Sequence, residues 1–242
     1  MALGQDQESV PFLEQAAQYG RQIDYSRPAS GQIYGFIRDA IVSMQLEPGQ
    51  LISETALAKK FGVSRTPVRE ALIKLSNLGF TEVRPQRGTY VSRFSLEQIL
   101  EARFIREALE VSVVSYLADN PERKVITEAE SIIAEQKSAA DKDDTLLFQA
   151  LDDKFHQLLA SYTSYQRVAG MIEEEKAHMD RVRNLSLHKS GQYKRVLAQH
   201  RAIIRALKSG DVSKAASAMS IHLREVFKVL DTLPAEHPEY FQ

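Results

Sequence analysis

The chain of 242 residues contains no cysteine, which excludes disulfide bonds and metal sites built from thiolate ligands. It also has no apolar run near the roughly 20 residues that a membrane-spanning helix needs. Its first ten residues, MALGQDQESV, lack the basic and apolar regions of a secretory signal. These absences favour a soluble, cytoplasmic protein that does not enter a membrane.

Charge is distributed unevenly along the chain, although the formal net charge is only −1. Residues 30–94 carry nine Lys/Arg and five Asp/Glu, whereas residues 95–242 carry 20 and 23. A basic module on an acidic body suits a polyanionic partner for the module alone. The length admits one large domain or two ordinary ones.

The most specific local pattern is a pair of helices that precede a hairpin. Ser53 can cap a helix that ends at Gly62, and Ser64 can cap the next one, which Gly79 would close. The second helix has one apolar face at 3.6-residue spacing, formed by Val68, Ala71, Leu72, Leu75 and Leu78. Two helices joined by a short turn through glycine are typical of a helix-turn-helix.

After Gly79 the pattern changes to two short strands, at residues 80–83 and 89–91. The loop Arg84-Pro85-Gln86-Arg87-Gly88 joins them and reads as a wing. Together with a helix from about residue 32 to 44, these elements predict a winged helix-turn-helix over residues 30–94. Residues 1–29 are either disordered or a short amphipathic helix.

Five residues of this segment are candidate DNA contacts: Arg65, Thr66, Arg69, Arg87 and Gly88. Arg65 and Arg69 lie one helical turn apart, so both can enter a major groove and bind guanine. Arg87 and Gly88 would meet the sugar-phosphate backbone beside the wing. Any single arginine is more often a solvated surface charge, so the prediction depends on cap, turn, helix and wing occurring together.

From Ser95 onward the spacing is helical throughout. Helices are expected from residue 95 to Asn120-Pro121, and over residues 122–140, 144–162, 164–186, 191–208 and 211–231. The fold class is therefore mainly α: an N-terminal winged helix-turn-helix followed by an all-α antiparallel helix bundle over residues 95–232. The tail, residues 233–242, is expected to be loosely packed.

Candidate metal ligands lie in this bundle. Asp152 and His156 stand four residues apart on one helix, while His200 and His222 belong to the last two predicted helices. Three imidazoles and a carboxylate form a nitrogen and oxygen site for Zn, Ni, Mn or Co. The alternative is that each histidine is an ordinary hydrogen-bonded core residue, because spacing cannot show that separate helices converge.

The other histidines are weaker candidates. His178 stands four residues from Glu174, but the charge run around them is typical of a solvated face. His188 and His237 occur in turn or tail sequence.

The run SRTPVREAL from Ser64, with DDKFH, QHRAII and IHLRE later in the chain, resembles the GntR-type transcription regulators of the FadR subfamily, which carry an FCD effector domain. The resemblance covers about residues 30–231. It implies a homodimer on a palindromic DNA operator, commonly a repressor, with a small organic acid as effector. It also implies a divalent metal held by Asp152, His156, His200 and His222.

By the same resemblance, Arg106 is a candidate partner for an effector carboxylate, with Arg103 and Arg183 as weaker candidates. The alternative for Arg106 is an ion pair with Glu110 on its own helix. Thr55 departs from the family pattern, where many members have arginine after the residue equivalent to Glu54, so one phosphate contact is missing or moved.

Two other functions remain open at this stage. Three histidines and a carboxylate could activate water in a metal-dependent hydrolase, although no separate general base is evident. An architectural DNA-binding protein without an effector is the third possibility. The resemblance favours a non-enzymatic, metabolite-responsive regulator.

Overall fold

The computed structural model describes residues 23–186 and 192–242, which divide into two compact units. One unit combines the described residues up to Leu96 with the C-terminal segment Pro234–Gln242, and the other is Glu97–Leu233. Most of the predicted N-terminal tail lies outside the described residues. No helix in the described ranges is long and apolar enough to cross a membrane.

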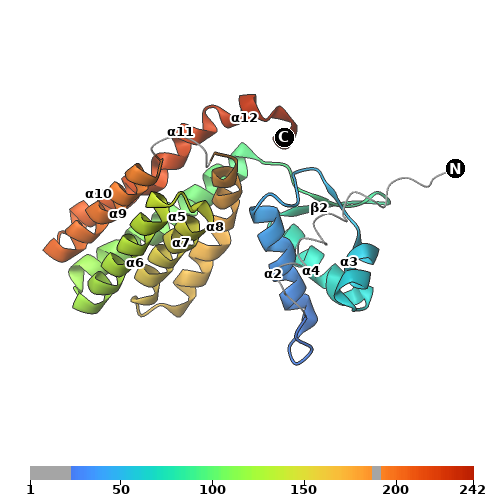
Figure 1. Cartoon of the computed structure of the whole chain (residues 1–242), viewed down its shortest axis with the longest axis horizontal. Coiled ribbons are helices and arrows are strands. Elements are labelled where there is room, and N and C mark those ends of the chain that lie inside the picture. Colours follow the sequence, from blue (N-terminus) through green and yellow to red (C-terminus); the bar gives the residue numbers. More distant parts are fainter. Residues whose placement is uncertain (1–22, 187–191) are drawn as a thin grey trace. The chain divides into compact units, whose positions relative to one another are not determined.

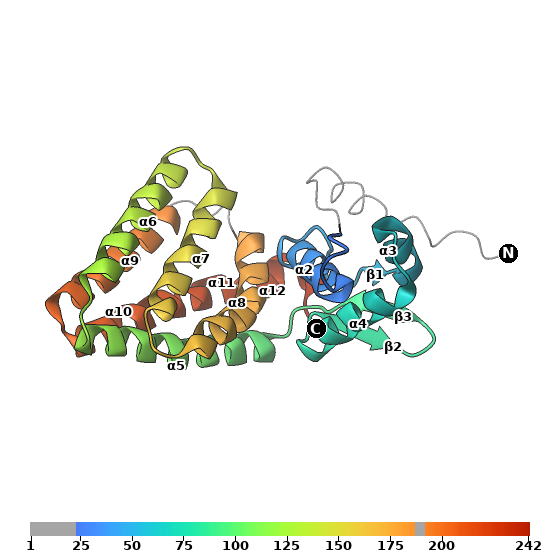
Figure 2. The same ribbon diagram turned by 90° about the horizontal axis from the view of Figure 1, so that it is seen from below.

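The N-terminal unit is a winged helix-turn-helix, as predicted (Figures 1 and 2). Its elements are α2 (Ala29–Val42), β1 (Leu51–Ile52), α3 (Glu54–Phe61), α4 (Arg65–Asn77), β2 (Thr81–Arg84) and β3 (Gly88–Val91). Helices α2 and α4 pack against each other. Their apolar faces, which include Ile33, Ile37 and Ile41 on α2 and Leu72 and Leu75 on α4, are almost wholly buried.

Local capping explains both ends of α3 and the C-terminal end of α4. Ser53 Oγ accepts a hydrogen bond of 3.2 Å from Ala56 N, and Gly62 ends α3 with φ +64°. Gly79 follows α4 with φ +76°. Ser64 occupies the cap position of α4 with an extended backbone, but its side chain makes no capping hydrogen bond, so that detail of the prediction is wrong.

The wing is a three-stranded antiparallel sheet in the order β1-β3-β2, where the sequence predicted two strands. The additional strand has only two residues, Leu51 and Ile52, which pair with Tyr90 and Thr89. So short a strand has no periodicity to detect. Gly88 has φ +107°, and a Cβ there would lie 2.9 Å from Leu51 Cδ1, so the wing requires glycine at this position.

The C-terminal segment packs on the winged-helix unit, so the expectation of a loosely packed tail is wrong. Phe94 N donates to Tyr240 O at 2.8 Å, and Gln242 N donates to Phe94 O at 3.0 Å. The rings of Phe94 and Phe241 lie 5.1 Å apart, and both side chains are buried. Short helices α12 (Leu233–Glu236) and η2 (Pro238–Tyr240) lead to this contact.

The second unit is a helical bundle, as predicted. Its helices are α5 (Leu96–Asp119), α6 (Arg123–Asp141), α7 (Thr145–Ser161), α8 (Gln166–Ser186), α9 (Gln192–Ser209), α10 (Val212–Leu223), η1 (Arg224–Val226) and α11 (Phe227–Leu230). Helix α6 packs against α7 and α9, and α9 against α10 (Figures 1 and 2).

The predicted single helix over residues 211–231 is broken. Helix α10 ends at Leu223, and a 3₁₀ turn separates it from α11. At this turn the Glu225 carboxylate lies 3.3 Å from Arg195 Nε and accepts a hydrogen bond of 3.3 Å from Gln199 Nε2. These contacts come from α9, which is distant in sequence, so the periodicity of residues 211–231 could not predict them.

Candidate metal centre and DNA-recognition surface

The four predicted metal ligands lie together. Asp152 and His156 project from the same face of α7, His200 from α9 and His222 from α10. One potential ligand atom from each falls within 4.8 Å of the others. The first three side chains are buried and His222 is partly buried. Helix packing has therefore produced the convergence that spacing could not demonstrate.

The remaining histidines do not join this group. His178 is not among the clustered ligands of the described residues, and His188 lies outside those residues. His237 Nδ1 lies 3.6 Å from Glu239 Oε1 in the C-terminal segment.

Each histidine of the group has an oxygen acceptor at Nδ1. His200 Nδ1 lies 3.0 Å from Gln136 Oε1, and His222 Nδ1 lies 3.0 Å from Gln199 Oε1. The third contact joins His156 Nδ1 to a carboxylate oxygen of Glu110. An acceptor at Nδ1 selects the tautomer with the proton on Nδ1, which leaves the Nε2 lone pair available. The two glutamines were not predicted from the sequence, because a glutamine on a helix has no distinctive pattern.

The Nε2 atoms face a common point. His156 Nε2 and His222 Nε2 are 3.0 Å apart, and His200 Nε2 is 3.4 Å from Asp152 Oδ1. His200 Nε2 is buried without a hydrogen-bond partner among the described residues. A buried unsatisfied nitrogen is costly, and a cation at the common point would satisfy it. The residues therefore fit a metal ion bound by nitrogen and oxygen.

Electrostatics keep these side chains in their ligand forms. Burial raises the pKa of Asp152, but the combined attraction of Arg183, whose Nη1 lies 2.5 Å from Asp152 Oδ2, and of the neighbouring histidines outweighs burial and holds that pKa well below its usual range. Burial lowers the pKa of His200 to about 3. Burial also puts the pKa of His222 well below its usual value. The group thus contains an ionised carboxylate and at least two neutral imidazoles.

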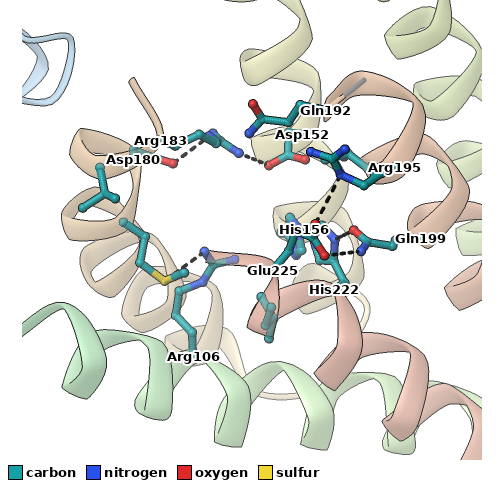
Figure 3. Close-up of a pocket in the computed structure, with 14 residues that line it drawn as sticks. Arg106, Asp152, His156, Asp180, Arg183, Gln192, Arg195, Gln199, His222 and Glu225 are labelled. Atoms are coloured by element: carbon teal, nitrogen blue, oxygen red, sulfur yellow. Dashed lines mark hydrogen bonds and ion pairs between the residues drawn. The ribbon is translucent and has the colours of Figure 1, made fainter. Parts of the chain in front are cut away.

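A cavity of about 90 Å³ adjoins the group and is lined by Asp152, His156 and His222 (Figure 3). Two predicted effector residues line it as well. Arg106 donates from Nε to Glu110 at 2.7 Å, so the ion pair considered as an alternative is present. Arg183 is held by Asp152 and by Asp180, whose Oδ1 is 2.9 Å from Arg183 Nη2.

Arg103, the third predicted effector residue, does not line the cavity. It pairs with Glu107, and its guanidinium lies 4.8 Å from the centre of the Phe227 ring. The cavity instead contains Arg195, which the sequence analysis missed. Arg195 carries a half-exposed side chain and faces Glu225 (Figure 3).

The predicted DNA contacts are exposed on the N-terminal unit. Arg65 and Thr66 open α4, and Arg69 follows one turn later. Both arginines reach the carboxylate of Glu54 on α3. Arg87 and Gly88 lie at the tip of the wing. There, Tyr90 donates from its hydroxyl to Arg87 O at 3.2 Å.

The comparisons with known proteins agree with this organisation. The model for "Bacterial regulatory proteins, gntR family" matches residues 29–91, and the FCD domain model matches residues 99–225. The HTH-type transcriptional repressor RspR of Escherichia coli (strain K12) is 35% identical over 220 residues, which cover 91% of this chain and 96% of RspR.

A second relative is the probable D-xylose utilization operon transcriptional repressor of Paenarthrobacter nicotinovorans. It is 30% identical over 196 residues, covering 80% of this chain and 85% of that protein. Among solved structures, E. coli McbR/YncC has the same fold, with a TM-score of 0.72 at 20% identity over 84% of this chain and 97% of that one. The chain therefore belongs to the GntR family of bacterial regulatory proteins and is a DNA-binding transcription regulator with an FCD domain.

Proposed function

We propose that this regulator is a metal-dependent, metabolite-responsive repressor that binds a palindromic operator as a homodimer. One observation carries the proposal: three imidazoles with acceptors at Nδ1 direct their Nε2 atoms, beside the Asp152 carboxylate, at one point next to a cavity. The relatives described above are regulators, which favours regulation over metal-dependent hydrolysis.

The metal ligands of the proposal are Asp152, His156, His200 and His222. Imidazole and carboxylate donors suit Zn, Ni, Mn or Co, and do not distinguish among them. A divalent cation bound there supplies fixed positive charge at the wall of the cavity. The buried network around the ligands holds their rings in place, so binding requires little rearrangement of side chains.

The effector of the proposal is a small carboxylate. Arg106, Arg183 and Arg195 line the cavity, and guanidinium groups bind carboxylates with paired hydrogen bonds. Arg106 and Arg183 are held by carboxylates at 2.5 Å, whereas Arg195 is half-exposed and its contact with the Glu225 carboxylate is longer, at 3.3 Å. Arg195 is therefore the guanidinium that an incoming anion reaches most easily.

The DNA contacts of the proposal are Arg65, Thr66, Arg69, Arg87 and Gly88. Arg65 and Arg69 read bases in the major groove, while Arg87 and Gly88 meet the backbone. Effector binding changes DNA affinity only to the extent that the effector binds the DNA-competent and incompetent states with different affinity.

The test of the metal centre replaces one ligand and one matched histidine. His222→Gln removes a partly buried ligand, whereas His178→Gln removes the rival histidine on α8. Zn²⁺ affinity is measured by competition with a chromophoric chelator. We expect His222→Gln to weaken Zn²⁺ binding by at least about tenfold, since even the loss of a residue that only hydrogen-bonds to a ligand costs that much, and His178→Gln to leave it unchanged. Equal Zn²⁺ affinity in both variants would contradict the proposal.

A further inference from the structure

The carboxylate of Glu54 lies between the two arginines proposed to read DNA. Arg65 Nη2 is 3.0 Å from Glu54 Oε2, and Arg69 Nη2 is 3.3 Å from the same oxygen. Arg69 Nε also donates to Glu54 Oε1 at 3.5 Å. The Glu54 side chain is only 19% exposed, whereas those of Arg65 and Arg69 are 60% and 62% exposed. One partly buried acid thus anchors two exposed cations.

The position of Glu54 is determined by the helix-turn-helix itself. Glu54 is the first residue of α3, directly after the cap residue Ser53, where the helix dipole favours a negative side chain. Helices α3 and α4 pack against each other, and Leu57 on α3 and Val68 on α4 are both buried. The backbone therefore presents the carboxylate to both arginines.

We infer that Glu54 is a positioning residue for sequence recognition: it orients Arg65 and Arg69 before DNA arrives. A guanidinium has five N–H donors. Arg69 uses donors on Nε and Nη2 for Glu54, so Nη1 and the second hydrogen of Nη2 remain for a bidentate contact with guanine. Holding long side chains in one geometry reduces the ordering cost of binding.

The same carboxylate has the opposite effect on non-specific binding. Non-specific affinity depends on the neutralisation of phosphates by cations. A negative charge among the groove-facing arginines weakens that attraction. Glu54 therefore raises the selectivity for the cognate sequence in two ways: it strengthens cognate binding by orienting the arginines, and it weakens non-specific binding. This inference rests on the proposed DNA contacts of Arg65 and Arg69.

Replacing Glu54 should leave the fold intact, because ion pairs with exposed partners contribute little to stability. The test uses the full-length chain with Glu54→Gln. The matched control is Glu70→Gln, which removes the same charge from α4, where Glu70 is exposed and pairs with neither arginine in the described structure. The probe is a duplex obtained with the unmodified protein from a random-sequence library, compared with a scrambled duplex of equal length and composition.

Fluorescence anisotropy at one salt concentration gives the ratio of the two affinities. We expect Glu54→Gln to reduce this ratio by about tenfold, within the range that one bidentate base contact contributes, with equal or tighter binding to the scrambled duplex. Glu70→Gln should keep the ratio. A second selection with Glu54→Gln should show relaxed base preference at the positions that the arginines read, an effect that a purely structural role would not produce.

A reference variant, Arg65→Gln/Arg69→Gln, separates the inference from the proposed function. If it loses selectivity while Glu54→Gln keeps the ratio within twofold of the unmodified protein, the inference about Glu54 is wrong and the DNA contacts stand. If Glu54→Gln and Glu70→Gln reduce the ratio equally, the effect is one of net charge and the inference is also wrong. If the double variant itself keeps its selectivity, the proposed contacts fail, and the role of Glu54 fails with them.

Discussion

At the scale of single residues, hydrogen-bond acceptors decide what the histidines can do. A neutral imidazole carries its proton on either nitrogen, and an acceptor beside Nδ1 makes that nitrogen the donor. Gln136 is fully buried and reaches both His200 Nδ1 and the carboxylate of Asp152, at 3.0 and 3.5 Å. It thus connects two proposed ligands on different helices.

The role of these acceptors can be tested at Gln199 while all four proposed metal ligands stay in place. Gln199→Leu removes the acceptor at His222 Nδ1, so the ring is free to adopt the wrong tautomer or orientation. We expect Zn²⁺ affinity to fall by about 10–100-fold, measured by isothermal titration calorimetry. The control Gln157→Leu changes an exposed glutamine that contacts Glu173 on α8. An unchanged affinity in Gln199→Leu would show that the acceptor does not orient the ring.

At the scale of elements, the C-terminal segment differs most from expectation. Residues 234–242 belong to the same compact unit as the winged helix. The attachment point is Phe94, in the stretch between β3 and α5, through two backbone hydrogen bonds and a ring contact with Phe241. The last residues of the chain therefore stabilise the DNA-binding unit.

Phe241→Ala measures that contribution. Removing a buried ring costs the transfer free energy of its atoms and leaves a cavity, so we expect a loss of about 3 kcal/mol in the unfolding free energy of the winged-helix unit. Urea denaturation followed by circular dichroism gives the value. Phe104→Ala, on a ring that is 66% exposed, should change stability by less than about 0.5 kcal/mol. Equal small effects of both substitutions would mean that the C-terminal segment is not anchored.

At the scale of the whole molecule, the chain passes twice between its two units, after Leu96 and after Leu233. The second passage lies close in sequence to the proposed metal site, because only η1 and α11 separate His222 on α10 from the segment at Leu233. Each unit has its own buried core. Two cores within one chain allow separate unfolding transitions, which a single domain of this size would not show.

This organisation predicts that metal stabilises one unit selectively. Zn²⁺ at 100 times its dissociation constant should stabilise the helical unit by about 2.7 kcal/mol, with a smaller shift of the winged-helix transition. Differential scanning calorimetry with Zn²⁺ and with a chelator measures both transitions, and Phe241→Ala identifies the one that belongs to the winged helix. Identical shifts of both transitions would indicate a single cooperative unit, and no shift would argue against the metal site.

Local signals in the sequence predicted most elements of the DNA-binding unit. Ser53, Gly62 and Gly79 begin or end helices through interactions within a few residues, and the apolar face of α4 repeats at the period of the helix itself. Such features depend on neighbouring atoms, so they can be recognised before the fold is known. Two details escape local signals: strand β1 has only two residues, and the side chain of the cap residue Ser64 makes no capping hydrogen bond.

The tertiary structure alone decided how the candidate sites are assembled. The four proposed ligands were identified as residues, but their meeting required α7, α9 and α10 to pack together, and the acceptors at their Nδ1 atoms come from α5, α6 and α9. The same holds for Glu54, which is separated by 11 and 15 residues from the arginines that it contacts. Contacts between distant segments arise from the shape and burial of whole faces, which no single stretch of sequence contains. Sequence by itself determined which residue types lie at helical spacing and so which residues are proposed as ligands, and packing determined which of them meet.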